Sequence, residues 1–301
     1  MEQKLEKPQW LRIKLNTNEE FLNIKDTIKQ HNLHTVCESA HCPNISECWN
    51  GGTVTFMLMG DVCTRGCKFC AVKTGNPIKK LDNEEPKKLA KALADIKLFD
   101  YVVLTSVNRD DLEDGGASHF AECVKEIKKE YPEIIVEVLI PDFRGDVNAL
   151  RKIVDAKPEV IAHNIETVER LQKKIRDVRA NYKQSLSVLE NVKKLNPKIY
   201  AKSSIMLGLG EEDEEVLQAM KNLRGIDVDI LTIGQYLRPT EWHLAVMQYV
   251  PPEKFEYFRQ NALELGFLFC ASGPFVRSSY RAGEMFVRNV IKRDKQYETL
   301  P

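Results

Sequence analysis

Apolar runs of strand length recur along most of the chain, and amphipathic, charge-rich segments of helical length separate them. The runs are rich in Val, Ile and Leu, and they are apolar nearly throughout. Strands of this kind are typical of parallel sheets that are covered on both faces. Seven such runs are present, at residues 53–59, 101–107, 134–140, 160–165, 199–207, 228–233 and 266–271.

The segments between these runs have helical length and an amphipathic pattern. One of them opens with Asn83-Glu84-Glu85-Pro86, an acidic helix start with proline in the first turn. The predicted helices span residues 86–97, 117–129, 147–156, 184–195, 213–223 and 253–265. Strands that alternate with helices indicate an α/β fold with a parallel sheet. Seven strands are too few for a closed eight-stranded barrel, so we expect an incomplete (β/α) barrel, with an open doubly wound sheet as the competing topology.

The alternation occupies only the middle of the chain, which predicts three parts. Residues 1–52 form a polar N-terminal extension with one predicted helix at 19–30, followed by a loop-like stretch that carries cysteines. Residues 53–275 form the barrel, and residues 276–301 form a charged C-terminal tail.

Composition narrows the class of protein. The chain has 301 residues, of which 43% are hydrophobic, and its 44 basic residues balance its 44 acidic residues. A nucleic-acid partner usually shows as a basic excess, so we expect none. No stretch reaches the roughly 18 apolar residues of a membrane span, and the first residues lack the apolar core of a secretory signal. We therefore expect no membrane partner and a cytoplasmic location.

Cysteine usage is uneven. Six of the eight cysteines lie between Cys37 and Cys70, and only Cys123 and Cys270 lie elsewhere. In a reducing compartment a tight cluster of cysteines indicates metal binding rather than disulfides. Cys123 lies in a predicted helix and Cys270 in an apolar strand, so both are expected in the core.

One cysteine motif directly follows the first predicted strand. Cys63, Cys67 and Cys70 have the spacing C-x3-C-x2-C. Three thiolates at this spacing can hold three irons of a [4Fe–4S] cluster and leave the fourth iron open to a substrate. The alternative is a structural zinc loop, which usually needs four ligands in paired C-x2-C elements. The count of three, without a histidine nearby, favours the cluster.

Two further motifs have less specific chemistry. Cys37, Cys42 and Cys48 have the spacing C-x4-C-x5-C, and either a cluster or a zinc site completed by His41 or His34 would fit them. The third motif is Arg277-Ser278-Ser279-Tyr280, near the C-terminus. Taken alone, one of its serines would simply cap a helix that starts near Arg281.

Together the three motifs resemble the lipoyl synthase family within the radical S-adenosylmethionine (SAM) superfamily. The resemblance extends from about residue 35 to 284. Further segments that resemble the family are Glu38–Asn44, Thr105–Leu112, Asp114–Ala117, His163–Thr167, Met206–Glu211 and Gln235–Thr240.

The resemblance implies two [4Fe–4S] clusters and SAM as cofactors. Cys63, Cys67 and Cys70 would hold the cluster that cleaves SAM reductively. Cys37, Cys42 and Cys48 would hold an auxiliary cluster with Ser279 as its fourth ligand. The activity implied is insertion of two sulfur atoms at the sixth and eighth carbons of a protein-bound octanoyl-lysine, with the auxiliary cluster as the sulfur source. Protein groups alone cannot replace unactivated C–H bonds, so the chemistry must come from cofactors.

The roles of several other residues are less specific, and most of them have a purely structural alternative. Gly115 and Gly116 would let backbone approach SAM, or would simply form a tight turn. Asn164, Glu166 and neighbouring His163 would face the cofactor at a strand end, or would be satisfied polar groups there. Gly208 and Gly210 would form a loop near adenosine, or an ordinary turn. Arg277 would help to position the substrate.

Partners follow from the resemblance. The implied substrates are octanoylated lipoyl-carrier domains, namely dehydrogenase acyltransferase subunits and the glycine-cleavage carrier protein. The cofactors also imply an electron donor such as ferredoxin or flavodoxin and an iron–sulfur carrier that rebuilds the auxiliary cluster. The lysine pairs Lys79-Lys80 and Lys87-Lys88 would form a solvated face, or would meet an acidic carrier domain.

Two competing functions remain at this point. One is a different radical enzyme that inserts sulfur into a nucleic acid or a free small molecule. The other is a non-catalytic protein, either a zinc module or a cluster carrier. Metal analysis separates the second from an enzyme, because about one zinc or about eight irons would be bound.

Overall fold

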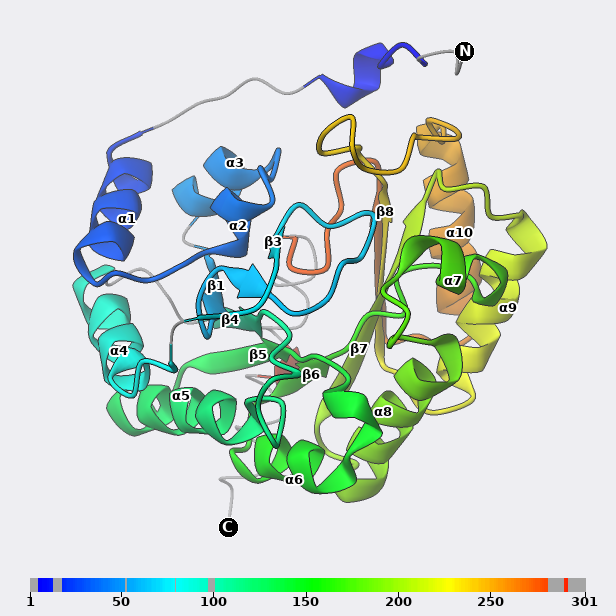
Figure 1. Ribbon diagram of the computed structural model, residues 1–301. Helices are drawn as coiled ribbons and strands as arrows, with labels where there is room; N and C mark the ends of the chain where they lie inside the picture. The colour runs from blue at the N-terminus through cyan, green and yellow to red at the C-terminus, as the bar shows by residue number, and fades with distance from the viewer. Residues whose placement is uncertain are drawn as a thin grey trace.

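The computed structural model describes residues 5–12, 18–51, 53–78, 80–96, 101–280 and 290–291. Within them a curved sheet is surrounded by helices, as Figure 1 shows. Its strands are β1 (Thr55–Leu58), β4 (Tyr101–Ser106), β5 (Ile135–Leu139), β6 (Val160–Ala162), β7 (Tyr200–Leu207), β8 (Ile230–Gln235) and β9 (Phe269–Gly273).

The sheet has the topology of an incomplete barrel. Its seven strands pair in chain order, β1-β4-β5-β6-β7-β8-β9, and each neighbouring pair is parallel. The order never reverses, so the doubly wound alternative is wrong and the incomplete (β/α) barrel is confirmed. No pairing of β1 with β9 occurs in the described part of the chain, which leaves the barrel open.

Six long helices follow the strands on the outside of the sheet. The six predicted helices are confirmed to within two residues at each end. They are α4 (Glu85–Ile96), α5 (Ala117–Glu130), α6 (Val147–Asp155), α8 (Tyr182–Leu195), α9 (Asp213–Arg224) and α10 (Pro252–Glu264). Side-chain caps explain several starts: Asn181 accepts from the amide of Gln184, and Glu212 and Glu215 form a capping box.

The N-terminal extension departs from the prediction in one respect. Its first helix, α1 (Glu19–Gln30), has the predicted bounds. The stretch that follows is not loop-like, because it contains α2 (Val36–Ser39) and α3 (Ile45–Asn50). Helices of four and six residues are too short to show a helical period in the sequence. Burial of Trp49 holds α3 in place, with its ring 4.9 Å from that of Phe21 on α1.

The hydrophobic pattern of the sequence also did not predict several shorter elements. They are η1 (Gln9–Leu11), β2 (Val62–Cys63), β3 (Lys73–Thr74), η2 (Phe143–Gly145), η3 (Glu169–Leu171) and α7 (Gln172–Ile175). β2 and β3 pair with each other in parallel, beside the first cysteine motif.

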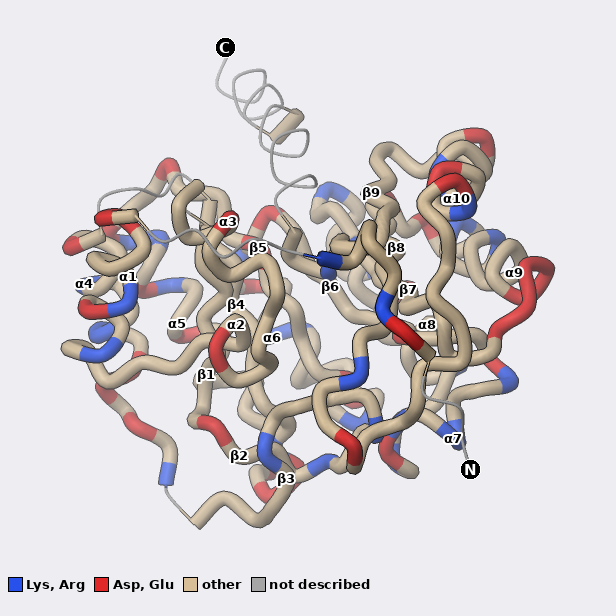
Figure 2. The backbone as a smooth tube through the Cα atoms, turned by 90° about the horizontal axis from the view of Figure 1, so that it is seen from above, with Lys and Arg blue, Asp and Glu red and all other residues tan. Residues whose placement is uncertain are grey.

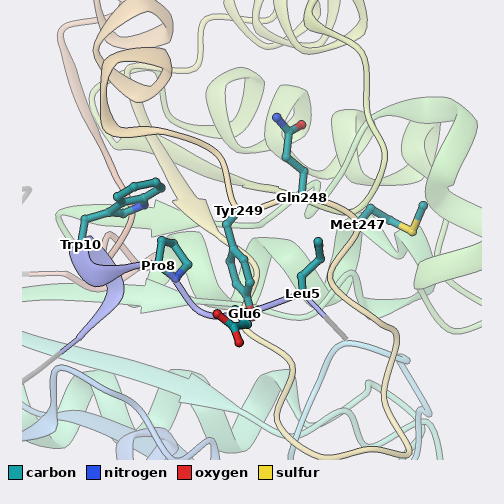
Figure 3. A pocket seen from close by; sticks show the side chains of 7 residues that line it. All are labelled: Leu5, Glu6, Pro8, Trp10, Met247, Gln248 and Tyr249. Atoms are coloured by element: carbon teal, nitrogen blue, oxygen red, sulfur yellow. The ribbon is translucent and has the colours of Figure 1, made fainter. Parts of the chain in front are cut away.

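The N-terminal segment with η1 lies against the loop between β8 and α10 (Figure 3). The two segments line a shallow groove of about 280 Å³. Its lining residues are Leu5, Glu6, Pro8, Trp10, Met247, Gln248 and Tyr249. Among the described residues, no helix has both the length and the apolar character needed to cross a bilayer.

A buried ion pair lies within the sheet, in its N-terminal half. Lys202 on β7 donates to both carboxylate oxygens of Glu137 on β5, at 2.7 and 2.8 Å. The hydroxyl of Tyr101 on β4 donates to the same carboxylate at 2.5 Å. Buried charges are tolerated when they are paired and hydrogen-bonded, as these are. A satisfied polar network therefore lies inside the barrel next to the apolar cluster of its N-terminal end, and the opposite, C-terminal end carries the cysteine loop.

Candidate metal centres

The first centre is the cysteine loop, residues 63–70, which follows β1. Backbone amides converge on its sulfur atoms. Those of Arg65 and Asn108 lie 3.4 and 3.3 Å from Cys63 Sγ, and that of Asp177 lies 3.3 Å from Cys67 Sγ. Such donors stabilise a thiolate and a metal-bound sulfur alike.

The three thiols of the loop lie close enough to influence one another. Burial is the main cause that raises the pKa of Cys67 to about 11 and that of Cys70 to about 12. The neighbouring thiols add to both shifts. Metal ligands must lose their protons, so iron binding here displaces protons from thiols that hold them firmly. The geometry offers three soft donors and fits an iron–sulfur cluster.

A buried guanidinium anchors the loop to the barrel. Arg65 is only 5% exposed and bridges two carboxylates at the ends of neighbouring strands. It lies 2.9 Å from Asp110, which follows β4, and 2.6 Å from Asp142, which follows β5. Planar guanidinium groups suit such two-sided recognition. The cysteines are thereby fixed to the sheet.

Backbone and side-chain contacts hold both edges of the loop. On one side the amide of Lys68 donates to the carbonyl of Ile175 at 2.9 Å. On the other side the amide of Leu244 donates to the carbonyl of Lys68 at 3.2 Å, and His243 bonds the carbonyl of Cys70 at 2.9 Å. Three segments far apart in sequence are therefore side by side around the cysteines.

The second centre gathers the other three clustered cysteines. Cys37 lies on α2, Cys48 on α3, and Cys42 between them; Cys37 and Cys48 are each 8% exposed. Burial, assisted by Cys42, raises the pKa of Cys37 to about 11. Burial also raises the pKa of Cys42, against the opposing effect of Arg277.

The C-terminal motif lies against this second centre. Asn44 donates to the carbonyl of Phe275 at 2.6 Å, and the hydroxyl of Tyr280 lies 3.3 Å from Glu47. Arg277 is close enough to Cys42 to affect its pKa. Ser279 lies in the chain between Arg277 and Tyr280. The structure therefore brings the tail motif to the second cysteine set. A helix cap near Arg281 concerns residues outside the described part.

A glycine in β8 lets the tail reach this position. A Cβ atom at Gly234 would lie 2.0 Å from the carbonyl oxygen of Val276. The tail therefore crosses β8 at a point where only a hydrogen side chain leaves room. Glycine inside a strand marks close approach of another backbone, so Gly234 was the signal in the sequence that could have predicted this contact.

Two predicted cofactor contacts lie near the cysteine loop. Glu166 has a left-handed backbone (φ 66°), and burial raises its pKa. Its charge contributes to the raised pKa of Cys67 and Cys70. The amide of Asn164 donates to Glu166 at 3.2 Å, and its buried Oδ1 has no hydrogen-bond partner within the described chain. A buried polar atom without a partner fits a site that receives a polar ligand.

The predicted glycines have structural reasons of their own. Gly115 (φ 62°) and Gly116 (φ 87°) lead into α5, and a Cβ at Gly116 would lie 2.2 Å from the sulfur of Met59. A Cβ at Gly208 would lie 2.2 Å from the amide of Gln235. These contacts support the tight-turn interpretation, while contact with SAM stays a prediction.

Other candidates are satisfied within the fold. His163 bonds the carbonyl of Ile140 and the hydroxyl of Ser185, each at 2.9 Å, as a polar strand end would. Cys123 and Cys270 are buried in α5 and β9, so both are core residues as predicted. Lys87 and Lys88 pair with Glu84 and Asp82, at 3.8 and 2.6 Å, as a solvated face would; Lys79 lies outside the described residues.

Comparison with known proteins identifies the superfamily. A family model described as the radical SAM superfamily matches residues 57–223. Methylornithine synthase has a TM-score of 0.54 at 16% identity, covering 83% of this chain and 82% of that one. The FeFe-hydrogenase maturase from Carboxydothermus hydrogenoformans has a TM-score of 0.50 at 13% identity, covering 90% and 78%. These solved structures share the fold. The barrel and its cysteine loop define a radical SAM enzyme.

Closer relatives identify the family. A model of the N-terminal domain of lipoyl synthase matches residues 1–42. Curated lipoyl synthases from an Anaeromyxobacter species and from Halobacterium salinarum are each 56% identical. The alignments cover 95% and 97% of this chain, and 96% and 94% of the relatives. An apicoplast lipoyl synthase from Plasmodium falciparum is 54% identical over 95% of this chain and 69% of that protein. The chain belongs to the lipoyl synthase family.

Family membership settles the class of reaction. The chain is a sulfur-inserting radical SAM enzyme of lipoate biosynthesis, its cofactors are SAM and [4Fe–4S] clusters, and its substrates are lipoyl-carrier proteins. The expected lipoyl synthase function is confirmed. The alternatives of a different sulfur-inserting enzyme and of a non-catalytic metal protein are therefore wrong.

Proposed function

We propose that the two cysteine sets divide the lipoyl synthase reaction between them. Cys63, Cys67 and Cys70 hold the cluster at which SAM is cleaved. The other set holds the auxiliary cluster, and its ligands are Cys37, Cys42, Cys48 and Ser279. When bound, SAM and the clusters supply the radical that removes hydrogen and the sulfur that replaces it at the sixth and eighth carbons of octanoyl-lysine. The convergence of three thiols at the C-terminal edge of the sheet carries this proposal.

The cysteine loop holds its cluster in a fixed position. The amides of Asn108 and Asp177 donate toward Cys63 and Cys67 and disperse the negative charge of their sulfurs. Arg65 locks the loop to two strand ends. Loops that carry chemistry need such support, because a misplaced reactive group costs rate.

Asn164 and Glu166 contact SAM in this proposal. Both lie at the end of β6 on the cysteine side, and the unpartnered Oδ1 of Asn164 can accept from a hydroxyl or amino group. Gly115, Gly116 and Gly208 allow backbone to line the same space, since none of them carries a side chain into it.

The second cysteine set suits a protected sulfur store. Cys37 and Cys48 are almost fully buried, which keeps water from a reactive sulfur source. Ser279 would hold one iron of this cluster through a hard oxygen, among three soft sulfur ligands, and would be the weakest ligand of the set. The described contacts at this centre join the extension (1–52), through Asn44 and Glu47, to residues 275–280 at the start of the tail (276–301). In this proposal both parts act on a substrate that is held by the barrel (53–275).

The partners and location follow the same proposal. The carriers are octanoylated dehydrogenase acyltransferase subunits and the glycine-cleavage carrier protein. Ferredoxin or flavodoxin supplies electrons, and an iron–sulfur carrier rebuilds the auxiliary cluster. The enzyme works in the cytoplasm, although relatives include apicoplast and mitochondrial forms.

The proposal is tested with an octanoyl-lysine peptide. The protein is purified without oxygen, its clusters are reconstituted, and SAM and dithionite are added. Mass spectrometry is expected to show a peptide that has gained two sulfurs and lost two hydrogens, together with 5′-deoxyadenosine. If 5′-deoxyadenosine formed but the peptide stayed unchanged with both clusters verified, the assignment of the auxiliary centre would be wrong.

Ser279 is tested separately by Ser279→Cys, with Ser278→Cys as the matched control. A cysteine ligand binds iron more tightly, so Ser279→Cys is expected to retain SAM cleavage and lose lipoyl product. The control is expected to keep both. Full product formation by Ser279→Cys would contradict the role given to the weak ligand.

A further inference from the structure

A buried carboxylate lies in the helix layer near the start of the cysteine loop. Figure 2 shows α4 and α5 on the side of the sheet that β1 and β4 form, with charged segments along both helices. Both helices are described in full, and Glu85 in the first turn of α4 is the one Asp, Glu, Lys or Arg of the two that is buried. Burying a carboxylate costs free energy unless its oxygens are hydrogen-bonded. The partners of Glu85 therefore show what this buried group holds in place.

The first partner of Glu85 is the backbone at the exit of β1. Both of its carboxylate oxygens accept from the amide of Met59, at 3.0 and 3.2 Å. Met59 is the first residue after β1 and has a left-handed backbone (φ 67°). A residue with a side chain rarely adopts this conformation unless its surroundings hold it there. Glu85 thus holds the bend at which the chain turns toward Cys63.

The second partner of Glu85 is His119, in the first turn of α5. Nε2 of His119 lies 2.6 Å from Oε2 of Glu85, and the two side chains are 8% and 9% exposed. α5 begins directly after Gly115 and Gly116, the glycine turn of the loop between β4 and α5. The buried pair therefore ties the end of β1 to this glycine turn.

The side chain of Met59 closes a ring of contacts. A Cβ atom at Gly116 would lie 2.2 Å from the sulfur of Met59, so the thioether lies directly against the glycine backbone. Gly116 has a left-handed backbone (φ 87°), and its amide donates to Asp114 at 3.0 Å. The contacts that start at Glu85 pass through Met59 and the glycine turn, and they return through His119.

We propose that Glu85 and His119 form a positioning pair that aligns SAM with the cluster that cleaves it. This inference deepens the proposed function and rests on it, because it takes the cysteine loop to hold the cluster and Gly115 and Gly116 to line the SAM site. The exit of β1 leads to the first of these parts, and the start of α5 carries the second. A misplacement of about 1 Å between reacting groups can cost about a hundredfold in rate. A buried pair that joins both parts sets the distance between them.

A similar pair at the opposite end of the barrel provides a matched control. Glu159, which directly precedes β6, accepts from the amide of Val136 at 2.8 Å and from Lys128 of α5 at 2.5 Å. The side chains of Lys128 and Glu159 are 19% and 11% exposed. This pair also ties α5 to a strand amide, but it lies at the N-terminal end of the strands, away from the cysteine loop. Loss of Lys128 should therefore lower stability and leave the SAM site unchanged.

The test compares His119→Ala and Lys128→Ala with the wild type. Each protein is reconstituted with both clusters, and 5′-deoxyadenosine is measured with dithionite, the octanoyl-lysine peptide and a range of SAM concentrations. In His119→Ala the rate at saturating SAM is expected to fall by roughly tenfold or more, with the iron content unchanged. Lys128→Ala is expected to keep the wild-type rate. Both variants are expected to lose stability toward urea, so a loss of stability alone does not explain a difference in rate.

A conservative replacement and a second substitution sharpen this test. The side-chain amide of a glutamine can donate from near the position of Nε2, so His119→Gln is expected to recover most of the rate that His119→Ala loses. Met59→Ala is expected to slow SAM cleavage severalfold. It is expected to add little to His119→Ala, because both changes open the same ring of contacts.

The inference, but not the proposed function, would be overturned by a wild-type rate at saturating SAM in His119→Ala, by an equal loss of rate in Lys128→Ala, or by no recovery in His119→Gln. Glu85, His119 and Cys123 also offer one ligand atom each, all within 4.8 Å of one another. About one zinc per chain in the wild type, lost in His119→Ala, would make this group a metal site instead. Failure of the wild type to cleave SAM, with both clusters verified, would refute the proposed function and this inference with it.

Discussion

The two cysteine centres of this chain are built in opposite ways. The cysteine loop is one continuous segment of eight residues, attached to strand ends by Arg65 and open to solvent at Lys68. The second centre is assembled from two ends of the chain, and its cysteines are mostly buried. The first arrangement suits a site that must receive electrons from outside. The second suits a store of sulfur that must stay away from water until it is used.

The comparison also shows what each centre depends on. The loop needs the barrel, because its anchors are Asp110 and Asp142 at the ends of β4 and β5. The second centre needs the tail to cross β8 at Gly234 and meet the segment around Asn44. A substitution that removes the contacts of one centre should therefore leave the other centre largely intact.

The largest effect is expected from Cys67→Ala. Removing one of three thiolates leaves the loop unable to hold its cluster, so 5′-deoxyadenosine and lipoyl product should both fall to background. Chromatography of a SAM incubation measures both. Cys270→Ala is the control, since Cys270 is buried in β9 and is expected to affect stability only. Residual cleavage well above background in Cys67→Ala would show that the thiol is not a ligand.

Arg65→Met is expected to weaken the first centre through its anchor. The change leaves Asp142 buried without its ion-pair partner, which typically costs about 3–5 kcal/mol in free energy of unfolding. Lys194→Met is the control, because its pair with Glu190 lies on the exposed side of α8 and should cost about 1 kcal/mol or less. Urea unfolding of the apo proteins gives both values. Equal losses would mean that burial does not set the strength of the anchor.

Acid should weaken the barrel through His163. Burial lowers the pKa of this imidazole from 6.5 to about 4. Between those values the unfolded chain binds the extra proton, so the stabilisation is complete above about pH 6.5 and is lost as pH falls toward 4. At pH 5 the loss should be about 2 kcal/mol relative to pH 7.5.

His163→Gln removes this titration and should flatten that part of the pH profile, as measured by urea unfolding at the two pH values. An unchanged slope in His163→Gln would mean that another group is responsible.

The smallest effect is expected from Tyr280→Phe. It removes a hydroxyl 3.3 Å from Glu47 and should cost about 1 kcal/mol at the second centre. Lipoyl formation should then slow severalfold while SAM cleavage is unchanged. Tyr257→Phe on the exposed side of α10 serves as the control. Equal slowing of both reactions would mean that the tail also supports the cysteine loop.

Much of the barrel could be predicted from the sequence, because apolar runs and amphipathic segments report burial directly. All seven strands and the long helices followed this pattern. The strand predicted at 160–165 ends at Ala162, since the chain turns there into the left-handed Glu166. The short helices α2 and α3 escaped because four to six residues cannot display a period.

The two cysteine sites also differ in how much of each could be predicted from the sequence. Spacing alone predicted the cysteine loop as a cluster site, because its three thiols are neighbours in sequence. The partners of Arg65 lie 45 and 77 residues away, and the contact between Asn44 and Phe275 spans 231 residues. Contacts of that range depend on the folded topology and leave no local pattern. Only the resemblance linked Ser279 with the distant cysteines.

That one centre generates the radical while the other donates sulfur is tested most directly by isotope labelling. The protein is reconstituted with heavy-isotope sulfide, dithionite and SAM are added, and the lipoyl peptide from a single turnover is weighed. Both sulfur atoms of the product are expected to be heavy, and Cys48→Ala is expected to form 5′-deoxyadenosine without any lipoyl product. A product that carries light sulfur, or one made by Cys48→Ala, would contradict the division of roles.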